Sequence, residues 1–147
     1  MRRPFNDYST KIAPRLWLDV AVHRARREAT MKKFLAIFTG SPAAMDAWKA
    51  MDPKQREEKE KAGIAGWKDW ASAHAKDIVD QGSPLGKTKQ VSAKGIADIR
   101  NNMGAWTLVQ AESQEAAARM FEKHPHFMLF PGEAVEVMEC LPMPEGV

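Results

Sequence analysis

The sequence predicts an α+β fold in which one antiparallel sheet carries two helices on one of its faces. Three observations lead to this prediction: an alternating apolar strand near residue 32, two capped helices, and further strands after each helix. The chain of 147 residues is long enough for one domain whose core needs no disulfides. Its 44% apolar and 28% charged residues are ordinary for a globular protein.

The first strand is predicted at residues 32–38, "KKFLAIF", and the following "TGSPAA" is interpreted as a break. Its side chains alternate between two faces that are both apolar: Phe34, Ala36 and Phe38 on one, Leu35 and Ile37 on the other. Such a strand is expected to be covered on both sides.

The first helix is predicted to begin after Asp52, with Asp52 as N-cap, Pro53 at the first position and Gln55 completing a capping box. It is expected to run to about Lys76. Spacings of three and four residues predict a single apolar face made of Ile64, Trp67, Trp70, Ala71 and His74.

Three strand predictions follow that helix. Residues 77–86 are expected to form a short strand closed by a Gly-Ser-Pro turn, and residues 87–104 a weak, edge-like strand before a turn at Asn101 and Asn102. The clearest strand pattern is at residues 104–113, where Trp106 and Leu108 are expected on one face and Thr107 and Val109 on the other.

The second helix is predicted to be capped by Ser113 and stopped by Pro125, with Ala117, Met120 and Phe121 facing inward. Residues 124–132 are interpreted as a loop or edge strand. The last strand, "EAVEVMECLP", is expected to have Val135, Val137 and Leu141 on one face.

This order is close to the ferredoxin-like split βαβ arrangement. Both helices would lie on one face of the sheet, and the other face would still be apolar. A lone sheet does not leave such a face exposed, so we expect a homodimer formed sheet to sheet.

The net charge of +3 does not indicate a nucleic-acid partner. Residues 1–30 carry seven basic and three acidic side chains, which leaves residues 31–147 with 15 basic and 16 acidic ones. The domain therefore lacks the basic surface that phosphate backbones select. No apolar run approaches the roughly 20 residues of a membrane span, and the single Cys140, expected to be buried, suits a reducing cytoplasmic compartment.

Residues 1–30 are interpreted as a basic extension and residues 31–147 as the domain, because "MKKFLAIF" is typical of the start of a small cytoplasmic protein. Leu16, Trp17, Val20 and Ala21 would form one stripe of a short helix. Three interpretations of the extension stay open: a start codon assigned upstream of Met31, a tail or docking helix, and a transit peptide, which its acidic residues disfavour.

Several segments together are similar to the YCII-related proteins of the dimeric α+β barrel superfamily. They are "MKKFLAIFTG", "GWKDWASAHAKDIVDQGSPLG", "GAWTLVQAESQEAAARMFEKHPHF" and "PGEAVEVMECLPM", which cover most of residues 31–143. The resemblance implies a ferredoxin-like protomer, a dimer built through the sheets, and a pocket between sheet and helices. It does not extend to the residues before Met31.

Two departures from the family limit what the resemblance implies about chemistry. Better-understood members pair a histidine near the start of the first helix with an acid, whereas the comparable "AGIAGWKDW" has no histidine. The Asp-Gly-Pro-Phe motif of a subgroup associated with sigma factors is replaced by "IADIRNNMGAW". The catalytic pair and the link to transcription therefore do not carry over.

The main candidate for chemistry is "KHPHF", in which His124 and His126 flank Pro125. In an extended segment both rings would point the same way and act as an acid–base pair. They would also suit a metal, with Glu133, Glu136 or His74 as further ligands. The favoured alternative is that His124 caps the preceding helix C-terminus while His126 packs at a pocket rim, with no metal or cofactor.

Trp67, Trp70 and Trp106 would line a pocket for an aromatic ligand, or form core, and His74 and Asp80 would border it. Two functions remain. One is a small isomerase- or lyase-type or cofactor-free enzyme acting on an aromatic or lactone-like substrate, with His126 handling the proton. The other is a non-catalytic dimeric module that binds a small molecule or a protein and would suit a regulatory role.

Overall fold

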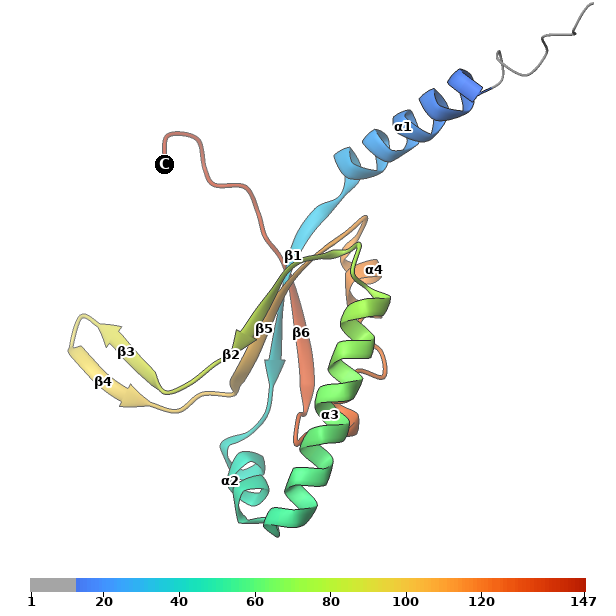
Figure 1. The fold of residues 1–147 in the computed structure, drawn as a ribbon. Coiled ribbons are helices and arrows are strands. Elements are labelled where there is room, and N and C mark those ends of the chain that lie inside the picture. Colours follow the sequence, from blue (N-terminus) through green and yellow to red (C-terminus); the bar gives the residue numbers. More distant parts are fainter. Residues whose placement is uncertain (1–12) are drawn as a thin grey trace, which may run out of the picture. The chain divides into compact units, whose positions relative to one another are not determined.

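The computed structural model describes residues 13–147, apart from the side chains of residues 13–15 and 27–29 (Figure 1). The chain divides into two units, Met1–Met31 and Lys32–Val147. The described part of the first unit consists of helix α1 (Ala13–Thr30) and Met31, and the α1 side chains from 16 to 26 are all exposed. None of the described helices is both long enough and apolar enough to cross a membrane.

The second unit is built on a four-stranded antiparallel sheet in the order β2-β5-β1-β6. These strands are β1 (Lys32–Thr39), β2 (Ile78–Pro84), β5 (Met103–Ala111) and β6 (Ala134–Glu139). Helix α3 (Pro53–Ala73) connects β1 to β2, and helix α4 (Gln114–Arg119) connects β5 to β6. Both helices lie on the same side of the sheet (Figure 1), so the mixed α+β architecture and the split βαβ order agree with the sequence-based prediction.

The core lies between this sheet and the helices. On β1, Phe34, Ala36 and Phe38 are fully buried, and Val109 of β5 and Phe121 join them. The alternation predicted for β5 is confirmed, since Thr107 and Val109 are both buried on the helix side.

The caps predicted for the two helices, now α3 and α4, are present. Asp52 Oδ2 accepts a hydrogen bond from Gln55 N at 3.2 Å, and Ser113 Oγ accepts one from Ala116 N at 3.1 Å. The predicted end of the first helix is wrong, because α3 stops at Ala73. There His74 leaves the helical conformation, and its carbonyl accepts hydrogen bonds from the next turn instead.

Helix α2 (Pro42–Ala50) occupies a segment that the sequence analysis interprets as a break. Ser41 Oγ accepts a hydrogen bond from Ala44 N at 3.1 Å, and Pro42 stands at the first helical position. Ser41-Pro42 therefore starts a helix. As with Asp52-Pro53 at the start of α3, a side-chain oxygen caps the helix and proline occupies its first position.

Strands β3 (Thr88–Ser92) and β4 (Gly95–Ile99) form a separate two-stranded sheet, where the sequence predicts one weak edge strand. This hairpin projects away from the main sheet (Figure 1), and its facing pair Val91 and Ile96 is exposed. The Gly-Ser-Pro turn predicted after β2 lies inside the strand, where Gly82 with φ +68° creates an irregularity in the pairing.

Three further predictions near the C-terminus are wrong: the loop or edge strand at residues 124–132, the place of Leu141 on the last strand, and the burial of Cys140. Residues 124–132 are neither extended nor a simple loop, since helix α5 (Pro125–Met128) begins there. The last strand ends at Glu139, so Cys140 and Leu141 lie beyond it and are exposed. Val135 and Val137 pack against the core as predicted.

Candidate ligand-binding site

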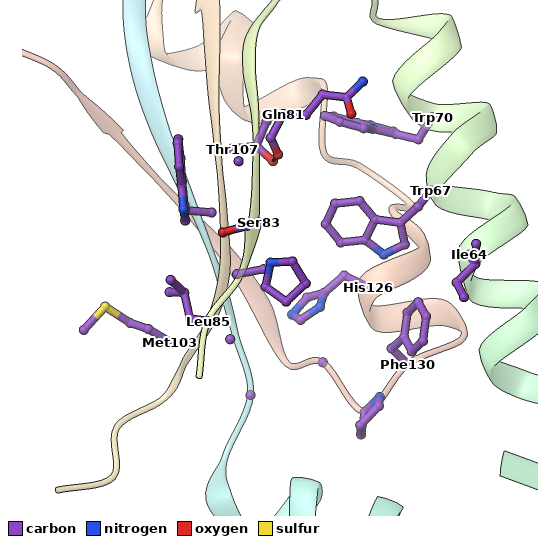
Figure 2. A pocket seen from close by; sticks show the side chains of 18 of the residues that line it. Ile64, Trp67, Trp70, Gln81, Ser83, Leu85, Met103, Thr107, His126 and Phe130 are labelled. Atoms are coloured by element: carbon purple, nitrogen blue, oxygen red, sulfur yellow. Dashed lines mark hydrogen bonds between the residues drawn. The ribbon is translucent and has the colours of Figure 1, made fainter. Parts of the chain in front are cut away.

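A cavity of about 960 Å³ lies between helix α3 and the sheet. Ile64, Trp67 and Trp70 line it from α3, and Ser83 and Thr107 from the opposite strands (Figure 2). Phe130 and His126 reach it from the segment after α4. A cavity of this size is in the range that small-molecule sites occupy.

Trp67 and Trp70 form an aromatic wall that packs against the core on one side and faces the cavity on the other. Trp70 is held in place, because its Nε1–H donates to the carbonyl oxygen of Met120 at 2.8 Å and its ring stacks on Phe121 at 5.1 Å. Trp67 packs against Phe38, with ring centroids 4.6 Å apart. Trp67 and Trp70 therefore both pack against the core and line the cavity.

Two glycines let the segment that carries His126 lie close to α3. A Cβ on Gly63 would collide with the ring of Phe130, and a Cβ on Gly66 would come within 2.9 Å of Pro125 Cγ. Neither glycine was predicted from the sequence to have a role at the site. Helix geometry alone does not require a glycine at either position, since glycine inside a helix is unfavourable relative to alanine.

His126 is fixed by a backbone acceptor. Its Nε2 lies 2.7 Å from the carbonyl oxygen of Thr39, at the end of β1, and its ring packs against Gly132 and Phe38. Burial lowers the pKa of His126 below its ordinary value of 6.5, and the carbonyls of Thr39 and Ala134 offset part of that effect. Since a carbonyl can only accept, Nε2 of the neutral ring carries the proton and Nδ1 is its basic atom.

His124 has a different environment. It is completely buried, and its ring lies among Trp67 at 4.5 Å, Trp70 at 4.7 Å and Phe38 at 5.0 Å. Its Nδ1 accepts a hydrogen bond from the backbone N–H of His126 at 3.0 Å. Within the described residues its Nε2 has no hydrogen-bond partner, and burial, with the nearby His126 and His74, lowers its pKa to about 3.

The favoured interpretation of His124 is therefore wrong in its detail. The ring caps the N-terminus of α5 and not the C-terminus of the preceding helix, which ends at Arg119. The two histidines are not a parallel pair in an extended segment: His124 lies inside the core, while His126 lines the cavity. In the described part of the chain, no three His, Cys, Asp or Glu side chains are grouped to hold a metal ion.

One of the three remaining predicted site residues lines the cavity and two do not. Trp106 lines it, although its strand position puts its side chain on the sheet face opposite Thr107. His74 lies outside the lining, where its Nδ1 is 2.9 Å from the carbonyl oxygen of Trp70. Asp80 is also outside the lining, and its carboxylate accepts a hydrogen bond from Gly82 N at 2.8 Å in the irregular part of β2.

The charges around the cavity come from residues that the sequence analysis does not single out. Lys68 and Arg100 line it, and none of the described lining residues is Asp or Glu. Arg100 is paired with Asp46, Nη2 to Oδ1 at 3.1 Å. The helical spacing of Lys68 from Ile64 and Ala71 could have indicated its position, since these three residues share one side of α3.

No protein-family model matches this chain, and no curated protein matches it significantly. The resemblance to YCII-related proteins therefore remains a prediction made from the sequence.

Proposed function

We propose that this protein binds a small, flat, largely apolar molecule in the cavity between α3 and the sheet, and that His126 exchanges a proton with it. The observation that carries this proposal is the convergence of Trp67, Trp70 and a neutral, hydrogen-bonded His126 on one cavity of about 960 Å³. Aromatic walls with a few oriented polar groups are typical of small-molecule sites.

The chemistry proposed for His126 follows from its protonation. With Nε2–H donated to Thr39, the ring orientation is fixed and Nδ1 is the atom available to accept a proton. A histidine whose pKa is lowered is unprotonated near neutral pH, which a general base requires. This fits an isomerase- or lyase-type reaction, or a cofactor-free one, that begins with proton removal from an aromatic or lactone-like substrate.

A non-catalytic binding module is the second candidate function. The packing of both tryptophans and the fixed hydrogen bond of His126 would serve ligand recognition equally well. The two candidates differ in one measurable respect: the module binds a ligand and returns it unchanged.

We also propose that a second copy of this chain covers the sheet face that α3 and α4 leave free. In β1 and β5 the cross-strand pairs Leu35–Leu108 and Ile37–Trp106 lie on that face, and Met138 of β6 adjoins them with 44% of its surface exposed. Such a homodimer agrees with the dimeric barrel implied by the YCII-related resemblance, and the single cysteine fits a cytoplasmic protein. Light scattering on the wild type and Leu108→Lys would test it, since the variant should be monomeric.

The binding proposal is tested with 2-naphthol and coumarin, a fused aromatic alcohol and an aromatic lactone, titrated into the full chain by calorimetry. We expect binding of at least one compound, weakened about tenfold or more in Trp67→Ala and unchanged in Trp17→Ala, whose indole is in the other unit. Binding that is equal in both variants would contradict the proposed site. Product analysis with wild type and His126→Gln then separates enzyme from module.

A further inference from the structure

The cavity has an unbalanced set of charges. Its described lining contains two basic side chains, Lys68 and Arg100, and no carboxylate. The guanidinium of Arg100 is already paired with a carboxylate. Asp46 accepts hydrogen bonds from Nη2 of Arg100 at 3.1 Å and from its Nη1 at 3.4 Å. Nη2 also donates to the carbonyl oxygen of Pro42 at 3.4 Å. His126 adds no charge near neutral pH, since its pKa is lowered.

Lys68 has no such partner in the part of the chain that the structure describes. The side chains three and four positions away on α3 are apolar or neutral: Ile64, Ala65, Ala71 and Ser72. Elsewhere on the same helix the arrangement is different, since Lys61 pairs with Glu57 at 3.3 Å. Among the described residues that line the cavity, Lys68 is therefore the basic side chain whose charge is not paired with a carboxylate.

A second donor faces the same space. The Nε1–H of Trp67 donates to no group among the described residues, and it is not one of their buried unpartnered atoms. Figure 2 shows this nitrogen on the side of the indole that faces the space between His126 and Phe130. The neighbouring Trp70 differs, because its Nε1–H is occupied by Met120.

We propose that the ligand of this cavity is an organic anion with a flat apolar body, such as an aromatic carboxylate, whose charge is bound by Lys68. This rests on the proposed small-molecule function and adds the charge of the ligand to it. The apolar body would lie along Trp67 and Trp70, and the anionic oxygens would accept from the Lys68 ammonium and the indole N–H. A cation would meet Lys68 and find no carboxylate to pair with.

The test compares compounds of one shape and different charge. Calorimetry at neutral pH would measure the dissociation constants of 2-naphthoate, the neutral 2-naphthamide and the cationic 2-naphthylmethylammonium. We expect the anion to bind about fivefold tighter than the amide, a modest ratio because Lys68 is exposed and its charge is screened. The ammonium compound should bind most weakly.

Variants at positions 68 and 61 test whether Lys68 causes the preference for the anionic compound. Lys68→Gln should bring the naphthoate-to-naphthamide ratio close to one, Lys68→Arg should retain it, and Lys61→Gln, on the same helix but outside the lining, should leave it unchanged. Equal binding of the acid and the amide by the wild type would overturn the anion proposal and leave the binding site intact. Binding of none of the three compounds would count against the proposed function itself.

Discussion

The backbone N–H of His126 donates a hydrogen bond to Nδ1 of His124 at 3.0 Å, and this bond joins the core to the cavity. The acceptor ring is completely buried, whereas the donor residue lines the ligand space. His124 thus does for α5 what Asp52 does for α3, with an imidazole nitrogen in place of a carboxylate oxygen. It fixes the position of the backbone that carries the proposed base.

Replacing His124 should separate capping from packing. His124→Ala loses both, and we expect the free energy of unfolding to fall by about 3 kcal/mol or more, as when a buried aromatic ring is removed. His124→Asn keeps a side-chain oxygen that can cap α5 and should be about 1 kcal/mol more stable than the alanine variant. Urea unfolding measures both values, and equal stabilities would show that the cap contributes nothing.

His124 should also make the stability of the fold decrease at acidic pH. Burial lowers the pKa of His124 from 6.5 to about 3, so between these values the unfolded chain binds a proton that the folded chain does not. Stability is therefore complete above about pH 6.5 and declines as the pH falls toward 3, by on the order of 2 kcal/mol near pH 5.

Urea unfolding at a series of pH values checks this dependence. His124→Asn removes the titrating ring and should flatten the decline between about pH 6.5 and pH 5, apart from the smaller contribution of His126, whose pKa is lowered in the same direction. An equally steep decline in the variant would assign the acid sensitivity to other groups.

Gly132 provides the space in which the His126 ring lies. A Cβ at this position would collide with the ring, so Gly132→Ala should displace Nε2 from the carbonyl oxygen of Thr39. Without that acceptor the preference for the Nε2–H tautomer is lost, which imidazole ¹⁵N chemical shifts detect. Gly86→Ala is the matched control, because nothing lies within 4 Å of the added Cβ there. Unchanged shifts in Gly132→Ala would contradict the described geometry.

We expect Gly63→Ala to destabilise the protein, although a glycine-to-alanine substitution inside a helix usually stabilises it. Glycine to alanine inside a helix normally stabilises by about 1 kcal/mol. At position 63 the new Cβ collides with the ring of Phe130, so we expect Gly63→Ala to lower the free energy of unfolding by about 1–3 kcal/mol. Thermal unfolding measures it, and the double variant Gly63→Ala with Phe130→Leu should recover part of the loss. A more stable single variant would show that Phe130 does not lie against α3.

The parts of the fold that the sequence predicts are those with local signals. The alternation of Phe34, Ala36 and Phe38 and the caps Asp52 and Ser113 depend only on neighbours in the chain. Helix α2 has such a signal in Ser41-Pro42, but its nine residues are too few for the helical spacing of Met45 and Trp48 to distinguish a helix from a loop. The β3–β4 hairpin likewise has no buried face to create a pattern.

The site was harder to predict because its geometry depends on distant contacts. The sequence indicates His126 and the tryptophans, but the acceptor of His126 is Thr39, 87 residues earlier in the chain. Nothing in "KHPHF" distinguishes His124 from His126, and only the turn into α5 makes one a buried cap and the other a cavity residue. Lys68 stands out because none of the described residues that line the cavity is Asp or Glu, and that lining is assembled from distant parts of the chain.

The most direct test of ligand binding between α3 and the sheet uses the five tryptophans as internal probes. A ¹H–¹⁵N spectrum of the full chain resolves one indole N–H signal for each, and it would be recorded during titration with 2-naphthoate, 2-naphthol and coumarin. We predict that the Trp67 signal shifts in a saturable manner while that of Trp17, in the other unit, does not move. Titrations that shift no indole signal, or shift Trp17 and leave Trp67 in place, would contradict a binding site in this cavity.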